Sequence, residues 1–285
     1  MSAVYKTEAG GREVERRYRE LLEHWPTPHE QLRIPTREGE TFVVVSGPES
    51  APPLLLLHGA GGNALTWASA VPSLAQHFRM YVVDVIGEPG LSSPSRPPLD
   101  TEEHMLWLDD VMDGLGLASA PMVGVSLGGL LALDYATRRP DRVERLALLN
   151  PAGVGKFKTA ILVKLLFLGM LGDWGLRRKL LVAGGAELGE STAAEFVMLV
   201  FKHFKPRLEP VPLFDEDTLR GLRIPTLVLL GARDAMIDAR GTQRRFEHAV
   251  PHAEVVVLPE AGHFIGGEAP PILDFLRAQN PKRAR

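Results

Sequence analysis

The sequence contains no cysteine, which excludes disulfides, thiol nucleophiles and cysteine-ligated metals. An excess of one charge is also missing, because 32 Lys and Arg residues stand against 35 Asp and Glu residues. The resulting net charge of −3 is not typical of a protein whose main partner is nucleic acid. The lack of cysteine is compatible with a reducing compartment.

Long apolar runs are missing as well. The longest run, residues 160–171, is too short to span a bilayer and contains Lys164. Residues 1–19 are polar and charged and lack the apolar centre of a secretory signal. We therefore expect a cytoplasmic protein with no stable membrane insertion. The sequence contains no His-Glu-x-x-His motif, so we also expect no metal.

The composition, with 45% hydrophobic and 24% charged residues in a chain of 285, is that of a globular protein. Short apolar runs alternate with helical patterns along most of the chain. Strands are expected at residues 41–45, 54–57, 80–85, 121–125, 143–149, 225–230 and 254–258, and helices at 13–25, 64–77, 101–115, 127–138, 239–250 and 270–278. Because helices form the crossovers between parallel strands, this alternation predicts an α/β fold with a mostly parallel central sheet flanked by helices.

The alternation stops after the strand expected at 143–149. Between residues 151 and 213 only helical patterns and glycines occur, which indicates an insertion of roughly sixty residues. We therefore expect one α/β core formed by residues 1–150 and 214–285, with an N-terminal helical extension over roughly residues 1–30. Residues 151–213 are expected to form a helical cap.

The most informative motif is Gly124-Val125-Ser126-Leu127-Gly128, which lies between an expected strand and an expected helix. This pattern is typical of the strand–turn–helix elbow that exposes a serine nucleophile. The serine of such a turn has a strained backbone, so the residues two positions before and after it must be small. We therefore predict that Ser126 is a nucleophile.

A serine nucleophile needs a base, and the base needs an orienting acid. His263 and Asp234 each follow an expected strand, at the edge where ligands meet an open α/β sheet. The chain order Ser126, Asp234, His263 is that of the α/β hydrolases and differs from the orders in chymotrypsin-like and subtilisin-like enzymes. Asp238 is the alternative acid.

Residues 58–63, His-Gly-Ala-Gly-Gly-Asn, directly follow another expected strand. Acyl transfer creates an oxyanion that needs positioned donors, and small residues let backbone amides approach it. We predict that the amides of Ala60 and Leu127 form this oxyanion hole, the second of them at a helix N-terminus. His58 is expected to make structural hydrogen bonds, and Asp84 is expected to bind loop amides.

Short stretches of the chain resemble a known family. These stretches are residues 83–87, 124–130 and 215–220. Over residues 42–276 the chain resembles the α/β-hydrolase superfamily and, within it, bacterial carboxylesterases of the carboxylesterase NP (naproxen esterase) type. The resemblance implies ester hydrolysis without a cofactor, through an acyl-serine intermediate on Ser126, beneath a helical cap. Residues 86–92 depart from the Gly-His-Gly-type turn of many relatives, so this loop is expected to differ in shape.

The expected cap is rich in Leu, Phe and Met, and some of these side chains are expected to line the entrance of the site. Trp67, Leu127 and Phe264 are further candidates for pocket walls. We therefore expect the partner to be a small-molecule ester of small to medium size with an apolar group. The oligomeric state is left open by the sequence.

Other serine-triad hydrolases share this framework, namely lactonases, thioesterases, carbon–carbon bond hydrolases and perhydrolases. A distant alternative is an NAD(P)-binding oxidoreductase. Residues 59–64 fit the dinucleotide pattern G-x-G-x-x-A, and Asp84 follows about twenty residues later. This pattern usually opens its fold, and the alternative leaves Ser126, Asp234 and His263 without a role. We therefore favour a serine esterase.

Overall fold

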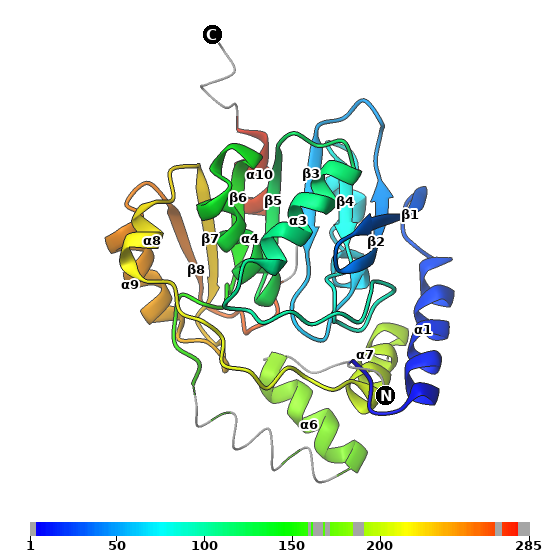
Figure 1. The fold of residues 1–285 in the computed structure, drawn as a ribbon. Coiled ribbons are helices and arrows are strands. Elements are labelled where there is room, and N and C mark those ends of the chain that lie inside the picture. The colour runs from blue at the N-terminus through cyan, green and yellow to red at the C-terminus, as the bar shows by residue number, and fades with distance from the viewer. Residues whose placement is uncertain are drawn as a thin grey trace.

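The protein is described by a computed structural model that covers residues 4–158, 161, 168, 172–184, 191–265 and 270–278. Its centre is an eight-stranded sheet in the order β1-β2-β4-β3-β5-β6-β7-β8 (Figure 1). The strands are β1 (His29–Thr36), β2 (Gly39–Ser46), β3 (Pro53–Leu57), β4 (Arg79–Val83), β5 (Ala120–Val125), β6 (Val143–Leu149), β7 (Thr226–Gly231) and β8 (Glu254–Leu258). β1 and β4 each pair antiparallel with β2, and all other pairs are parallel, so the predicted mostly parallel sheet is confirmed.

Helices cover both faces of the sheet (Figure 1). They are α1 (Glu8–Leu22), α2 (Val71–Leu74), α3 (Glu103–Gly114), α4 (Leu127–Arg138), α6 (Gly172–Gly184), α7 (Thr192–His203), α8 (Glu216–Arg220), α9 (Ala239–Ala249) and α10 (Pro270–Arg277), with short 3₁₀ turns at Ala64–Trp67 and Pro140–Arg142. Successive strand residues point to opposite sides, so Leu55 packs in a core cluster with α3, α4 and α9, whereas Leu54 packs with α1, α2 and α10. Because both faces are covered, β5 and β7 are buried at every position.

Strand β1 is absent from the elements expected from the sequence. It lies at the edge of the sheet and pairs only with β2, and Ile34 is its one buried residue. Pro35 also lies in this strand. Edge strands tolerate proline because its missing N–H can face solvent. A strand that is exposed over most of its length has little apolar periodicity for the sequence to reveal.

The helix expected at residues 64–77 is wrong. The chain forms a 3₁₀ turn at Ala64–Trp67 and then the single-turn helix α2. Pro72 lies in the first turn of α2, where its missing N–H is tolerated. In the middle of one continuous helix, Pro72 would lack the backbone N–H that the helix needs, so the helix is interrupted before it.

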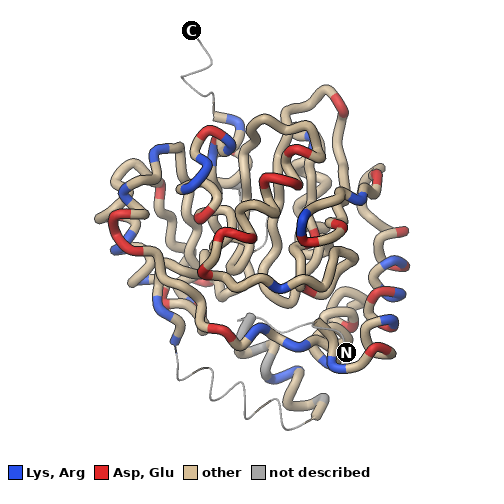
Figure 2. The backbone as a smooth tube through the Cα atoms, viewed as in Figure 1, with Lys and Arg blue, Asp and Glu red and all other residues tan. Residues whose placement is uncertain are grey.

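Helix α1 begins at Glu8, earlier than expected, because the Thr7 side chain accepts a hydrogen bond from the Gly10 amide and caps it. Its solvent face carries both charges, with Arg16 and Arg17 paired to Glu20 (Figure 2). Figure 2 shows acidic and basic residues interspersed along the rest of the backbone as well.

The segment between β6 and β7 carries α6 and α7, which lie beyond the edge of the sheet where the parallel strands end (Figure 1). The N-terminal segment joins the end of α7, because the Lys6 amide donates to the His203 carbonyl and the Lys205 amide donates to the Val4 carbonyl, each at 2.8 Å. Most of the apolar run at 160–171 lies outside the described residues. Within the described part of the chain, no helix is both long and apolar enough to cross a membrane.

One buried hydrogen bond ties the first antiparallel strands to α3. The Trp107 indole N–H donates to the Thr41 hydroxyl at 2.7 Å, and both residues are fully buried. Thr41→Val keeps the shape of the side chain but leaves the indole N–H without a partner. We expect the free energy of unfolding to fall by about 1–3 kcal/mol, measured by urea denaturation. Thr192→Val, on the exposed start of α7, is the matched control and should change stability by less than about 0.5 kcal/mol.

Candidate active site

Ser126 lies in a sharp turn between β5 and α4, with φ 52° and ψ −110°. A positive φ is rare for a residue with a side chain, so the surrounding packing must hold it. A Cβ on Gly124 would lie 2.3 Å from the Gly128 carbonyl oxygen, and a Cβ on Gly128 would lie 2.3 Å from the Leu57 carbonyl oxygen. Glycine is therefore required at both positions of the motif.

A continuous chain of hydrogen bonds joins Ser126, His263 and Asp234. The Ser126 Oγ lies 3.1 Å from His263 Nε2, and His263 Nδ1 lies 2.8 Å from Asp234 Oδ2. Because the carboxylate can only accept, Nδ1 carries the imidazole proton, and Nε2 accepts from the serine hydroxyl. Ser126 is 9% exposed, Asp234 1% and His263 3%, so these hydrogen bonds are largely shielded from water.

Asp234 is held in place by the backbone that follows it. Its Oδ1 accepts from the amides of Met236 at 2.7 Å and Ile237 at 3.0 Å, which leaves Oδ2 for His263. The alternative acid, Asp238, occupies the N-cap position of α9. Asp234, rather than Asp238, is therefore the carboxylate that the structure brings to the imidazole.

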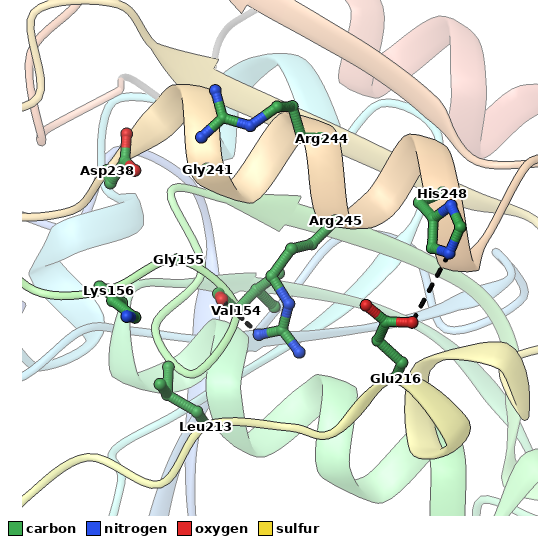
Figure 3. Close-up of a pocket in the computed structure, with 10 residues that line it drawn as sticks. All are labelled: Val154, Gly155, Lys156, Leu213, Glu216, Asp238, Gly241, Arg244, Arg245 and His248. Carbon is green, nitrogen blue, oxygen red and sulfur yellow. Dashed lines mark hydrogen bonds and ion pairs between the residues drawn. The ribbon is translucent and has the colours of Figure 1, made fainter.

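Asp238 instead lines a surface pocket of about 590 Å³ beside α9 (Figure 3). The lining consists of Val154, Gly155, Lys156, Leu213, Glu216, Asp238, Gly241, Arg244, Arg245 and His248. Arg245 donates from there to the backbone carbonyls of Val154, at 2.6 Å, and Phe214. The lining contains no member of the Ser126 hydrogen-bond chain, so this pocket is separate from the candidate active site.

Asn150 holds the loop that carries His263, a role that was not predicted from the sequence. Its side-chain amide donates to the carbonyls of Gly262 at 3.0 Å and His263 at 2.9 Å, and its Oδ1 accepts from the Gly231 amide at 2.8 Å. Asn150 has φ 41°, in the left-handed region that asparagine tolerates better than most residues. An asparagine directly after a buried strand is the signal that could have indicated this position.

The loop predicted to form the oxyanion hole lies against the serine. A Cβ on Gly59 would be 3.2 Å from the Ser126 Cβ, so the loop approaches the elbow closely. Ala60 is exposed at its tip, and Leu127 is the first residue of α4, where an N–H has no partner within the helix. Within the described part of the chain, neither the Ala60 nor the Leu127 amide donates a hydrogen bond, so both remain available to an anion.

His58 is fully buried and serves the backbone, as expected. Its Nδ1 donates to the Gly59 carbonyl at 2.9 Å, and its Nε2 accepts from the Val85 amide at 2.9 Å. Burial lowers the pKa of His58 to about 4, so the ring is neutral at physiological pH. The ring therefore connects the ends of β3 and β4 and has no nitrogen left for a substrate.

Asp84 also binds loop amides, as expected. Its Oδ1 accepts from the Tyr18 hydroxyl at 2.9 Å and the Ala64 amide at 2.8 Å, and its Oδ2 accepts from the Leu91 amide at 2.8 Å. Burial raises the pKa of Asp84 to about 6, against the effect of these donors. Because both oxygens are bound within the protein, Asp84 is not placed to bind a ribose hydroxyl, which disfavours the dinucleotide alternative.

The candidate pocket residues differ in their surroundings. Trp67 is 2% exposed and packs in the core cluster of α1 and α2, whereas Phe264 is 58% exposed, with its ring centroid 5.8 Å from that of His263. Phe201 of α7 lies over the loop of residues 58–63, called the oxyanion loop after its predicted role, because a Cβ on Gly61 would be 2.8 Å from its ring. The insertion thus supplies an apolar side chain, Phe201, beside the loop. The sequence predicted apolar residues in the insertion but could not predict which of them contacts the loop.

Comparison with known proteins yields consistent matches. A family model described as alpha/beta hydrolase fold matches residues 52–198. The chain is 32% identical over 275 residues to the uncharacterized carboxylesterase nap of Bacillus subtilis (strain 168), over 89% of this chain and 87% of the relative. The crystal structure of carboxylesterase CesB (YbfK) from Bacillus subtilis matches with a TM-score of 0.84 and 28% identity, over 95% of this chain and 100% of that chain. Naproxen esterase (carboxylesterase NP) from Bacillus subtilis matches with a TM-score of 0.83 and 31% identity, over 94% and 97%.

The contacts of Asn150 can be tested through stability. Asn150→Ala removes three side-chain hydrogen bonds and retains the unfavourable φ, so we expect the free energy of unfolding to fall by about 2–4 kcal/mol in urea denaturation. Asn150→Gly removes the same hydrogen bonds but accepts the positive φ. Both variants should be destabilised, and an Asn150→Gly protein as stable as the wild type would contradict the role of the side chain.

Proposed function

Because the chain belongs to the α/β-hydrolase family, we propose that it is a carboxylic ester hydrolase that acts through an acyl-serine intermediate on Ser126. The observation that carries this proposal is the hydrogen-bond chain from Ser126 through His263 to Asp234. The two free amides beside the serine, at Ala60 and Leu127, support it. The three similar proteins reported above, among them naproxen esterase, are all named as carboxylesterases.

In the proposed reaction, Ser126 Oγ attacks the ester carbonyl while His263 Nε2 takes the hydroxyl proton. Asp234 keeps the imidazole in the tautomer that can accept at Nε2, and it stabilises the imidazolium that forms. The Ala60 and Leu127 amides donate to the oxyanion. The imidazolium then protonates the leaving alcohol, and water attacks the acyl-enzyme by the same route. No cofactor or metal takes part in these steps.

The substrate class follows from the apolar side chains around the serine. Phe264 is exposed beside His263, and Phe201 reaches the oxyanion loop from α7. Such side chains favour an apolar acyl or alcohol group, because its burial is worth about 25 cal/mol per Å². We therefore propose a small to medium ester with an apolar group, and we propose that α6 and α7 form the helical cap over the site.

The nucleophile is tested with p-nitrophenyl esters from acetate to laurate. Ser126→Ala should lower kcat by about 10⁶-fold, since the residues of such a triad act as a unit. Ser73→Ala, at an exposed position of α2, is the control and should retain full activity. The preferred chain length reports the depth of the pocket. Near-normal turnover by Ser126→Ala would contradict the proposal. If Ser126 reacts with a serine-directed label but the protein hydrolyses none of these esters, thioester or carbon–carbon bond cleavage should be tested instead.

The acid is tested by a matched pair of isosteric changes. Asp234→Asn should lower kcat by about 10⁴-fold, because an asparagine does not hold the imidazole in the required tautomer. Asp238→Asn, which alters an acid on the same loop without a contact to His263, should leave kcat within about 2-fold of the wild type. If Asp238→Asn proves the damaging change in steady-state assays, the acid is wrongly assigned.

A further inference from the structure

A second buried carboxylate, Glu88, contacts the oxyanion loop. Glu88 is 2% exposed, and its Oε2 accepts from the Gly61 amide at 2.7 Å. Gly61 has φ 74° and directly follows Ala60, whose amide is a proposed oxyanion donor. Glu88 lies in the segment 86–92, which follows β4 in the chain. This segment therefore places a buried carboxylate against the loop.

The other oxygen of Glu88 faces a buried arginine. Arg207 Nε lies 3.4 Å from Glu88 Oε1, and the arginine side chain is only 8% exposed. The same guanidinium donates to the Pro97 carbonyl at 3.1 Å and to Glu209 Oε1 at 2.7 Å. Arg207 follows α7 in the chain, so this ion pair joins the oxyanion loop to the insertion between β6 and β7.

The ion pair is not completed by hydrogen bonds. Glu88 Oε1 and the Nε and Nη2 atoms of Arg207 are buried without a hydrogen-bond partner among the described residues. Buried charges with unsatisfied atoms destabilise a fold, and two apolar residues of similar size would serve stability better. The pair is therefore a poor source of stability, and its contact with the Gly61 amide is the feature to be explained.

The charge of Glu88 responds to pH in the range where esterases are assayed. Burial raises the pKa of Glu88 to about 7, against the opposing effects of the Gly61 amide, Arg207 and Arg96. Arg96 belongs to the same loop as Glu88 and donates to the Lys205 carbonyl at 2.8 Å. The other titratable groups around this cluster are Glu209, Tyr5, Asp84 and His104. Above about pH 7 the Glu88 carboxylate is charged and pairs with Arg207, and below it the pair is lost.

We propose that ionised Glu88 is a positioning residue that fixes Gly61, and with it the Ala60 amide, while Arg207 couples this loop to the segment after α7. The proposal rests on the proposed ester hydrolysis only in its effect on rate. Phe201 also lies against Gly61, so the loop contacts both a carboxylate and an aromatic ring. A loop held in this way keeps the Ala60 amide in position before the oxyanion forms. Donors that are already in place stabilise the oxyanion without a cost of reorganisation.

The kinetic test compares the wild type with Glu88→Gln between about pH 5.5 and pH 9. The side chain at position 88 is neutral at every pH in the variant, whereas in the wild type it is neutral only below the pKa of Glu88. At about pH 9 we expect kcat of the wild type to be about 10-fold higher than that of Glu88→Gln, with KM unchanged. At about pH 5.5 the ratio of the two kcat values should approach one. A ratio that is constant across the pH range, or a change in KM alone, overturns the proposal.

Glu209→Gln is the matched control, because Glu209 pairs with the same guanidinium without touching Gly61. Its kcat should follow that of the wild type at every pH. If Glu88→Gln does not fold, Glu88→Asp keeps the charge but shortens the side chain by one methylene. Glu88→Asp should lower kcat by about 10-fold at the upper pH, with KM unchanged, and an unaltered kcat overturns the proposal.

Amide hydrogen exchange separates this proposal from the proposed function. At about pH 8 the peptide that covers residues 59–64 should exchange faster in Glu88→Gln than in the wild type, and Glu209→Gln should match the wild type. Equal exchange in all three proteins overturns the role of Glu88. If the wild type lacks Ser126-dependent ester hydrolysis, the proposed function fails, and the exchange experiment alone decides whether Glu88 holds the loop.

Discussion

The close approach of α4 to the end of β3 is the constraint on which the site depends. Gly128 has no room for a side chain because the backbone of Leu57 and His58 lies against it. This contact brings the strained turn of Ser126 beside the loop that starts at Gly59. The proposed nucleophile and the Leu127 amide thus lie in one turn, and the Ala60 amide lies in another loop. Their spacing is nevertheless set by backbone atoms, whose positions do not depend on side-chain rotamers.

Buried polar side chains then keep these loops in position. His58 links the ends of β3 and β4, Asp84 binds two loop amides and a tyrosine hydroxyl, and Asn150 holds the loop of His263. Each such group is costly to bury and is tolerated because its hydrogen bonds are made. Glu88 and Arg207 differ, since their atoms are only partly satisfied. That difference separates groups that support the fold from a pair that we infer acts on the site.

The sequence indicated much of this because its strongest signals are local. Gly124, Ser126 and Gly128 lie within one turn, and the central strands β3 and β5 consist of apolar residues, so the motif, the sheet and the family could be inferred. Strand β1 could not, because an exposed edge strand carries no apolar period. The helix expected at 64–77 was wrong because one proline outweighed a helical pattern. Asn150 and the Glu88–Arg207 pair connect residues that are distant in the chain, and no local sequence pattern predicts such contacts.

The bonds between the N-terminal segment and the end of α7 have an evolutionary consequence. Lys6 and Lys205 donate to backbone carbonyls across this junction, and Tyr18 of α1 reaches Asp84 beneath the oxyanion loop. The segment from Val4 through α1 and the helix α7 are therefore one structural unit, although more than a hundred residues separate them in the chain. A recombinant that takes the insertion from one relative must inherit the N-terminal helix from the same parent, so crossovers in this family should be tolerated in pairs.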